Sequence, residues 1–162
     1  MLHGLRDCCV FLIAYTTLLG VLLATSYASE YNYIPDPSEL ECPGNVTYRA
    51  VTLTAYHPMF DSDRKRDYLD ASNRKLYTLQ EYLDNRAPYV TVGMDPTLHL
   101  PYGKEACIPE LNRHFRRAIR LQVRDTHEDL TGGGFRRVDV CVRTQEDSYD
   151  DVVNMLHVTL VL

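Results

Sequence analysis

Hydrophobic and polar residues alternate over several short runs in the last two-thirds of the chain. Residues 51–56 (VTLTAY), 118–123 (AIRLQV) and 138–142 (VDVCV) place apolar side chains at every second position, which is the period of a strand with one buried face. Other apolar runs lie between turn-forming residues. We expect short strands at residues 51–56, 89–94, 106–108, 118–123, 138–142 and 157–162.

Two segments carry helix signals. Thr78-Leu79-Gln80-Glu81 is a capping box, in which the threonine hydroxyl and the glutamate carboxylate satisfy the first free amides of a helix. It predicts a helix over residues 79–85. Ser148-Tyr149-Asp150-Asp151 is expected to cap a second short helix that runs to Met155. The charged run at residues 61–70 predicts a solvated loop, and the basic cluster at residues 113–117 an exposed hairpin.

These elements indicate a mainly β fold with one or two short helices. The chain of 162 residues has room for one domain and little more. Short strands in a domain of residues 50–162 suit a small closed barrel, because closure removes exposed strand edges. Residues 29–49 contain several prolines and few aliphatic residues, and we expect an extended N-terminal arm there.

The first residues have the features of a secretory signal. Residues 10–24 form an apolar run without a charge, and Ser26 and Ala28 are small residues at the −3 and −1 positions of a cleavage site. We expect a signal peptide at residues 1–28, cleaved after Ala28; the alternative is an uncleaved signal anchor. The protein is thus expected to be secreted to an extracellular, lumenal or periplasmic space, and to meet a membrane only through this segment if it stays attached.

Three cysteines remain after cleavage: Cys42, Cys107 and Cys141. An odd number permits at most one internal disulfide bond and leaves one thiol over. Cys107 and Cys141 both lie in strand-like runs, so we expect these two to pair and Cys42 to be the odd one. Asn45-Val46-Thr47 is a glycosylation sequon, which has meaning only in a eukaryotic secretory route.

Composition excludes some classes of function. The net charge of −5 disfavours a nucleic-acid binder of the usual basic kind. The sequence contains no nucleophile elbow, phosphate loop or dinucleotide fingerprint.

Three aspartates stand apart from the charged surface. Asp95 follows the expected strand 89–94, Asp125 ends the strand 118–123, and Asp139 lies among valines. A carboxylate in an apolar strand must find a partner or raise its pKa, and a raised pKa suits a general acid. The alternatives are that Asp139 faces water or pairs with Arg136 or Arg137, and that Asp95 and Asp125 cap turns.

The motifs around these aspartates resemble the "3D domain" family, named for three aspartates. The matching pieces, in order, are Thr54-Ala55-Tyr56, Ala71-Ser72-Asn73, Met94-Asp95-Pro96, Leu100-Pro101-Tyr102-Gly103, Val123-Arg124-Asp125-Thr126 and Arg137-Val138-Asp139-Val140. The family forms the catalytic barrel of membrane-bound lytic transglycosylase A and of small stationary-phase-survival muralytic proteins. The resemblance therefore implies a six-stranded double-psi β-barrel over residues 50–162.

The resemblance also implies a chemistry and a role for each aspartate. Asp139 matches the general acid/base, Asp125 lines the same cleft, and Asp95 shapes the site. The reaction would cleave the bond between N-acetylmuramic acid and N-acetylglucosamine in peptidoglycan, closing the muramyl 6-hydroxyl on C1 without a metal or other cofactor. The implied partner is a wall polysaccharide, and we expect a monomer.

The chain departs from the family pattern at His127, where the family has the glycine of D-T-G. His127 can be a second acid/base group, a metal ligand with Asp125 and Asp139, or a solvated turn residue. Lys104 follows Gly103 where family members often carry a basic residue. Residues expected to bind substrate are Tyr56, Lys104, Thr126 and His127.

Two other functions stay open. One is a non-catalytic module that binds or loosens walls, which the glycine-to-histidine change motivates. The other is a secreted structural or signalling protein that inherits only the barrel and uses a spare Cys42 and the tyrosine-rich arm for a partner.

Overall fold

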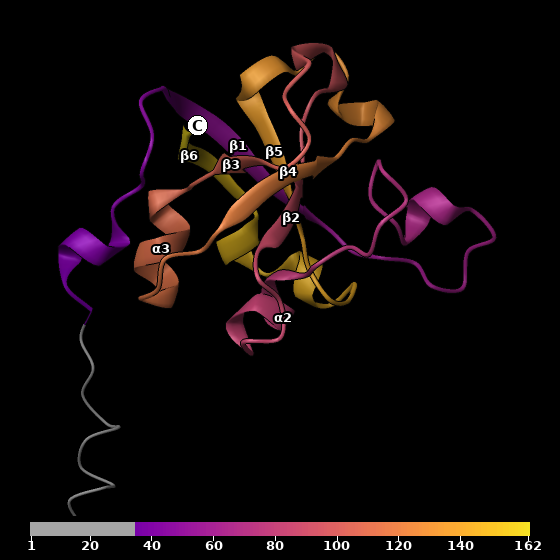
Figure 1. The fold of residues 1–162 in the computed structure, drawn as a ribbon, viewed down its shortest axis with the longest axis horizontal. Helices are drawn as coiled ribbons and strands as arrows, with labels where there is room; N and C mark the ends of the chain where they lie inside the picture. Colours follow the sequence, from indigo (N-terminus) through magenta and orange to yellow (C-terminus); the bar gives the residue numbers. More distant parts are fainter. Residues whose placement is uncertain (1–34) are drawn as a thin grey trace, which may run out of the picture. The chain divides into compact units, whose positions relative to one another are not determined.

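A computed structural model describes residues 35–162, which are coloured in Figure 1. The folded unit spans Asp36–Leu162. The expected signal segment, its cleavage site after Ala28 and the first residues of the expected arm lie outside the described residues. Within residues 35–162, no helix has the length and apolar character needed to cross a membrane.

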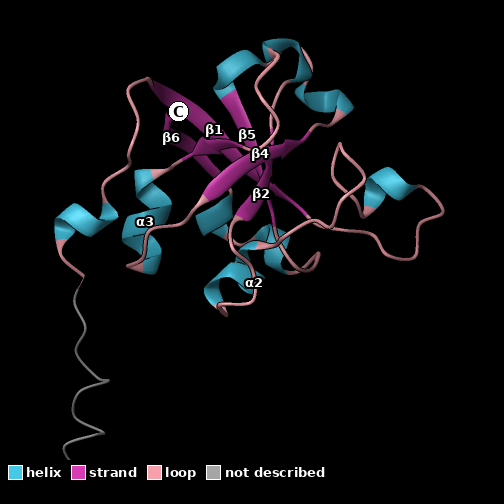
Figure 2. Ribbon diagram, in the orientation of Figure 1, coloured by secondary structure: helices cyan, strands magenta, loops and turns pink. Residues whose placement is uncertain are grey.

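The fold is mainly β, which confirms the prediction from the alternating pattern, and each expected strand is present with shifted ends. The strands are β1 (Thr47–Tyr56), β2 (Val90–Gly93), β3 (Lys104–Ala106), β4 (Leu121–Asp125), β5 (Arg137–Cys141) and β6 (Met155–Val161). The α-helices are α2 (Leu79–Leu83) and α3 (Pro109–Phe115). Figure 2 shows that the strands form the centre of the unit and that short helices and loops surround them.

All six strands belong to one mixed sheet, in the order β3-β4-β2-β5-β1-β6. Strands β1 and β5 are parallel, as are β2 and β4, and the other neighbours are antiparallel. The sheet curls, and its two ends meet at one point. There Cys107, just after β3, and Val161 of β6 exchange two backbone hydrogen bonds of 2.9 Å.

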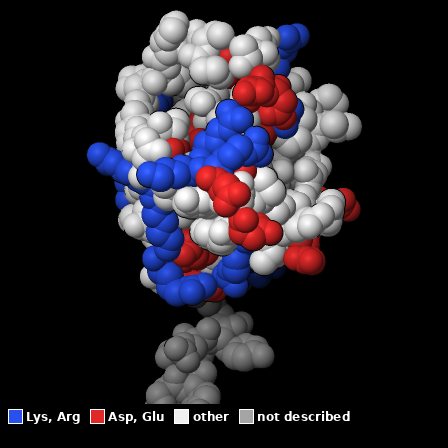
Figure 3. Space-filling model, turned by 90° about the vertical axis from the view of Figure 1, so that its right-hand side faces the viewer, with Lys and Arg blue, Asp and Glu red and all other residues white. Residues whose placement is uncertain are grey.

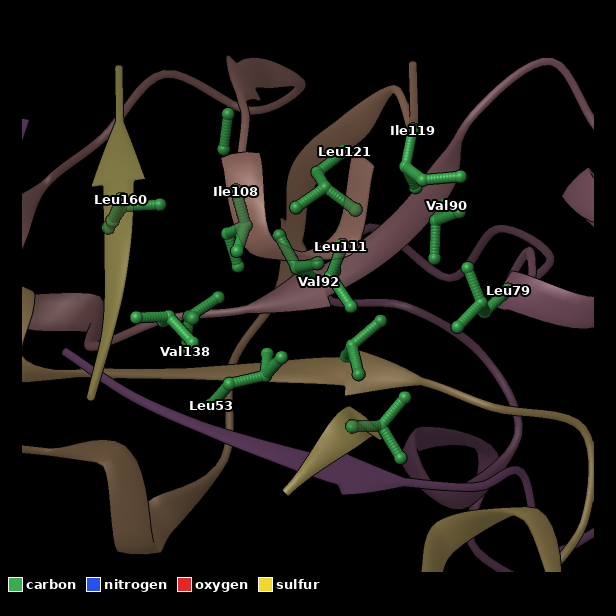
Figure 4. Packing of buried hydrophobic residues seen from close by; sticks show 14 of the residues in the cluster. Leu53, Leu79, Val90, Val92, Ile108, Leu111, Ile119, Leu121, Val138 and Leu160 are labelled. Carbon is green, nitrogen blue, oxygen red and sulfur yellow. The ribbon is translucent and has the colours of Figure 1, made fainter. Parts of the chain in front are cut away.

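The inside of the curled sheet is filled by aliphatic side chains. Leu53, Val92, Leu121, Val138 and Leu160 come from five different strands and are completely buried, and Figure 4 shows them around a common interior. Burying each such side chain stabilises the fold by roughly 1.5–3 kcal/mol. This core holds the strand ends, and the polar groups on them, in fixed positions.

The alternating sequence pattern predicts which side chains of β4 are buried, but it does not predict the burial of β5. In β4, buried and half-exposed side chains alternate as expected. In β5, every residue from Val138 to Cys141 is buried. Thr54 and Tyr56 of β1 are the register partners of Asp139 and Cys141, so these four side chains lie side by side on the same face of the sheet, away from Val138 and Val140.

The predicted pairing of Cys107 with Cys141 is wrong. Cys42 and Cys107 form the disulfide bond, with 5.5 Å between their Cα atoms, and Cys141 is a buried free thiol. Cys107 continues β3, which is three strands away from β5 in the sheet, or about 14 Å at the usual spacing between strands. Asn112 of α3 donates hydrogen bonds to both the Leu40 carbonyl and Cys107 Sγ, and so holds the segment that carries Cys42 beside Cys107.

The helix predictions are confirmed in part. Helix α2 begins with the expected capping box of Thr78 and Glu81. The predicted second helix is instead two 3₁₀ turns, Asp147–Tyr149 and Asp151–Val153. The predicted hairpin at residues 113–117 is wrong, because this cluster forms the end of α3. That helix has Pro109 in its first turn, where proline is tolerated.

Candidate functional site

The sheet brings the predicted aspartates together around the end of β2. Gly93 is the register partner of Asp125 in β4 on one side and of Asp139 in β5 on the other. Asp95 follows Gly93 by two positions. All three carboxyl groups belong to residues that are buried, at 3–4% exposure. A buried carboxyl group needs partners or a proton, and the three aspartates meet that need in different ways.

A cleft of about 480 Å³ opens beside this cluster. Its lining comes from residues 66–71, from residues 125–131 and from Pro96. Asp125, Thr126 and His127 line the cleft. Asp95, Asp139, Tyr56 and Lys104 are not among the lining residues.

Asp125 is the buried aspartate at the cleft wall. Its Oδ2 atom accepts a hydrogen bond of 2.9 Å from the Tyr56 hydroxyl, and its Oδ1 atom accepts one of 2.9 Å from the backbone N–H of Thr126. Burial raises the pKa of Asp125, against the opposing effects of His127 and of these two hydrogen bonds. The side chain therefore keeps its proton to a higher pH than an exposed aspartate and can donate it to a bound molecule.

His127 lies directly beside this carboxyl group. Its Nε2 atom is 3.8 Å from Asp125 Oδ2, and its ring packs edge-on against Tyr56 with 4.3 Å between ring centroids. Nε2 is buried and makes no hydrogen bond within residues 35–162. A Cβ atom on Gly93 would lie 3.2 Å from the ring, so the glycine makes room for the histidine.

The backbone at His127 does not require the glycine of the resembled motif. Its φ of −128° and ψ of 153° are extended values that any residue adopts. The change from glycine to histidine therefore adds a side chain to the cleft without straining the chain.

Asp139 has a different environment. The Thr54 hydroxyl donates to its Oδ1 atom, and Arg137 donates to both oxygens, from Nε at 2.9 Å and from Nη2 at 3.0 Å. The alternative that Asp139 pairs with Arg137 is thus confirmed. This two-pronged guanidinium contact fixes the position of the Asp139 carboxyl group against β1.

Replacing Arg137 with glutamine is expected to destabilise the protein by about 3 kcal/mol, because the buried Asp139 carboxylate loses its charged partner. The value lies at the low end for a broken buried pair, since Arg137 is 34% exposed. Urea unfolding followed by circular dichroism measures the change. The matched control is Arg136→Gln, which removes the same charge from an exposed neighbour. Equal stability of the two variants would contradict a structural role for the pair.

Asp95 fixes the turn that follows β2. Its Oδ1 atom accepts hydrogen bonds from the backbone N–H and the hydroxyl of Thr97, at 2.9 and 2.8 Å, and its Oδ2 atom accepts one of 2.7 Å from the Gly134 N–H. The hydrogen bond from Gly134 leads the causes that lower the pKa of Asp95. Asp95 therefore joins β2 to the glycine-rich turn before β5, in keeping with its expected role in shaping the site.

Asp70 belongs to the cleft wall but was not expected from the sequence. It is 4% exposed, and its Oδ1 atom accepts hydrogen bonds from the backbone N–H groups of Ser72 and Arg74, while Tyr102 donates its hydroxyl to Oδ2. Its charge adds to the effects that raise the pKa of Asp125. The available signal was the D-A-S-N turn at residues 70–73, which is a typical side-chain-capped turn.

Two further expected positions lie elsewhere. Lys104 is a half-exposed residue of β3. Asn45 is exposed in the segment before β1. Glycosylation of the sequon stays a prediction.

Within residues 35–162, no group of three or more His, Cys, Asp or Glu side chains is arranged to hold a metal ion. No family model and no curated protein sequence matches the chain, and the site's chemistry must be argued from its own geometry.

Proposed function

We propose that the protein binds a wall polysaccharide in the cleft and cleaves a glycosidic bond, with Asp125 as the general acid/base. One observation carries the proposal: a buried carboxyl group with a raised pKa forms part of the cleft wall. A carboxyl group whose pKa is raised by burial is the type of group that serves as a general acid. A cleft lined by polar and charged residues from two loops also suits a hydrated polymer more than an apolar ligand.

The proposed reaction needs one acid/base group and no water. Protonated Asp125 gives its proton to the leaving glycosidic oxygen as the bond from that oxygen to C1 breaks. The Asp125 carboxylate then takes the proton of the sugar's own 6-hydroxyl, whose oxygen forms the new bond to C1. The products are a free hydroxyl on one fragment and a 1,6-anhydro end on the other. The Tyr56 hydroxyl and the Thr126 N–H stabilise the carboxylate between the two steps.

This assignment differs from the one that the resemblance implies. The family pattern gives the acid role to Asp139, whereas in this chain Asp139 is held by Arg137 and is not a lining residue of the cleft. We keep Asp139 as a positioning residue that fixes β5 against β1. Asp125 instead lines the cleft, and burial raises its pKa, which are two properties that a proton donor needs.

We also propose that the sheet is a double-psi β-barrel of the 3D kind. Two parallel pairs, β1 with β5 and β2 with β4, joined through antiparallel β2 and β5, support this proposal. Contact between the two sheet ends at Cys107 and Val161 supports closure. The Cys42–Cys107 disulfide bond supports secretion, because such bonds persist in oxidising compartments.

The experiment is to incubate the purified protein with peptidoglycan and to identify soluble products by mass spectrometry. Anhydro ends are expected. Hydrated reducing ends would mean that water, rather than the 6-hydroxyl, attacks C1. No products on long incubation would overturn the enzymatic proposal.

One observation favours a second candidate, a module that binds wall glycan without cutting it. The His127 side chain lines the cleft where the resembled family has a glycine, and it occupies space close to the proposed acid. This candidate predicts that the protein sediments with insoluble glycan while no soluble product forms.

The pH dependence of cleavage is expected to report on Asp125. Its acid form is the active one, so kcat/KM should fall as pH rises through the pKa of Asp125, which burial raises above the usual value. A positive charge on His127 lowers that pKa. His127→Gln removes this effect, so the alkaline limb of the pH profile should move to higher pH. The control is the exposed His157→Gln, which should leave the limb in place. If the alkaline limb of His127→Gln stays in place or moves to lower pH, the assignment of Asp125 as the acid is contradicted.

A further inference from the structure

An arginine next to the proposed acid is stacked between two tyrosine rings. The Cζ atom of Arg124 lies 4.3 Å from the ring centroid of Tyr89 and 4.6 Å from that of Tyr102. In β4, Asp125 is buried and its neighbour Arg124 is half-buried, so their side chains leave the strand on opposite faces. Arg74 adds a second guanidinium, with Cζ 5.5 Å from the Tyr102 ring centroid.

The guanidinium of Arg124 is held in place but keeps most of its hydrogen-bonding capacity. Its Nε donates to Gln122 Oε1 and its Nη1 to the Tyr102 hydroxyl, both at 2.8 Å. These use two of the five N–H donors of an arginine, and the described part of the chain offers the others no acceptor. Neither Arg124 nor Arg74 forms an ion pair with any carboxylate of residues 35–162. The Asp70 carboxylate is linked to this guanidinium through the Tyr102 hydroxyl and not by a direct ion pair. A rigid fork with donors left over fits a planar anionic group.

The stacked arginine and the cleft share a wall. Tyr102 donates its hydroxyl to Asp70, which lines the cleft, and the backbone N–H of Ala71 donates to the Arg124 carbonyl at 3.2 Å. The turn at residues 70–74 thus separates the cleft from Arg124. A linear polymer that leaves the cleft across this turn meets Tyr102, which is 41% exposed.

We propose that these side chains form an anion-binding subsite for the polymer that occupies the cleft, and that the natural substrate is an acidic glycan bearing carboxylate groups. The subsite consists of Arg74, Tyr89, Tyr102 and Arg124. This inference rests on the proposed function, because it assigns the chemical class of the polymer. It predicts that one carboxylate of the glycan binds the remaining N–H donors of Arg124 while a neighbouring sugar contacts the exposed part of Tyr102.

The distribution of charge favours a sparsely charged polymer over a nucleic acid. Figure 3 shows Lys and Arg side chains gathered in a band on one face, with acidic side chains directly beside them. The chain as a whole carries a net charge of −5. A nucleic acid carries a phosphate on every nucleotide and needs many basic contacts, whereas a glycan with one carboxylate per few sugars needs only isolated ones.

The test is a binding measurement that needs no turnover. The Asp125→Asn variant of the full chain, which keeps its ligand intact, is titrated with a uronic-acid oligosaccharide and with the same oligosaccharide after its carboxyl groups have been reduced to alcohols. We expect the acidic form to bind about tenfold more tightly, which is the effect of one charge-assisted contact. Raising the salt concentration should shrink the difference.

When Arg124→Gln is added to the Asp125→Asn variant, the preference for the acidic oligosaccharide should disappear. Arg124→Lys keeps the charge but loses the planar fork, so it should retain only part of the preference. The matched control is Arg49→Gln, an exposed arginine of β1 without an ion pair in residues 35–162. Thermal unfolding verifies that each variant is folded. Equal affinity for the two oligosaccharides, a preference that survives Arg124→Gln, or tighter binding of single-stranded DNA at the same salt concentration would each overturn the proposal. The binding measurement needs no turnover, so it remains valid if the protein does not cleave glycan. Failure of the cleavage proposal and failure of the subsite proposal can therefore be told apart.

Discussion

Replacing Asp125 with asparagine is expected to slow the release of soluble glycan fragments by about 10²- to 10⁴-fold, which is the usual contribution of a positioned proton donor. Asparagine keeps the size of the side chain and an oxygen that accepts the Tyr56 hydrogen bond, but it has no proton to give. The fold should survive, because burial already disfavours the charged form of Asp125. Initial rates are measured by mass spectrometry of released fragments, and folding by the midpoint of thermal unfolding.

Two variants make this result interpretable. Asp63→Asn removes the same charge from an exposed position of the loop at residues 61–70 and should leave the rate unchanged. Asp139→Asn tests the role that the resemblance assigns. If Asp139→Asn abolishes release and Asp125→Asn does not, the proton donor is Asp139 and our assignment is reversed. If both variants cleave at the wild-type rate, neither aspartate is the acid.

Replacing Cys42 with serine is expected to lower the free energy of unfolding by about 4 kcal/mol, the chain-entropy value for a disulfide bond that closes a loop of 65 residues. The measurement is urea unfolding of the variant and of the wild type, each with and without a reducing agent. The wild type should lose stability on reduction and approach the variant, and the variant should not respond. A variant as stable as the oxidised wild type would contradict the expected contribution of this bond.

The Cys42→Ser variant also tests whether Cys42 is a free thiol that bonds to another chain. Because Cys42 is bonded to Cys107 and Cys141 is buried, the chain from Ser29 onward should run as a monomer on a non-reducing gel. Peptide mapping without reduction should recover the Cys42–Cys107 linkage. A dimer that disappears in Cys42→Ser would instead revive the idea of a covalent partner at this position.

The parts of the fold that the sequence predicts correctly are those set by neighbouring residues. Alternation places the strands, and Thr78 with Glu81 places the start of α2, since a capping box acts within one turn. Helix α3 was missed because its signals are weak: Pro109 marks its start, but Arg116 rather than a glycine adopts the left-handed conformation after its end. The cysteine pairing was missed because it depends on strand order, which no local pattern determines.

In the candidate site, too, the sequence predicts what depends on neighbouring residues and misses what depends on distant ones. Asp125, Thr126 and His127 are adjacent in the sequence, and all three line the cleft. Which aspartate can give up a proton depends on side chains that come from other strands, such as Thr54 and Tyr56 of β1. Asp70 reaches the site through the turn at residues 70–74, and nothing in its local sequence indicates that it lies beside Asp125.

The meeting of the two sheet ends also bears on how the chain folds. Strand β6 pairs with β1, the first strand, and its Val161 also bonds to Cys107 beyond β3. During synthesis, both edges therefore stay open until the last strand has emerged from the ribosome. Contacts between such distant segments make folding slow, and open edges attract other chains. The Cys42–Cys107 disulfide bond lies beside this junction and ties the segment before β1 to the end of β3, so it limits how far the two edges can separate.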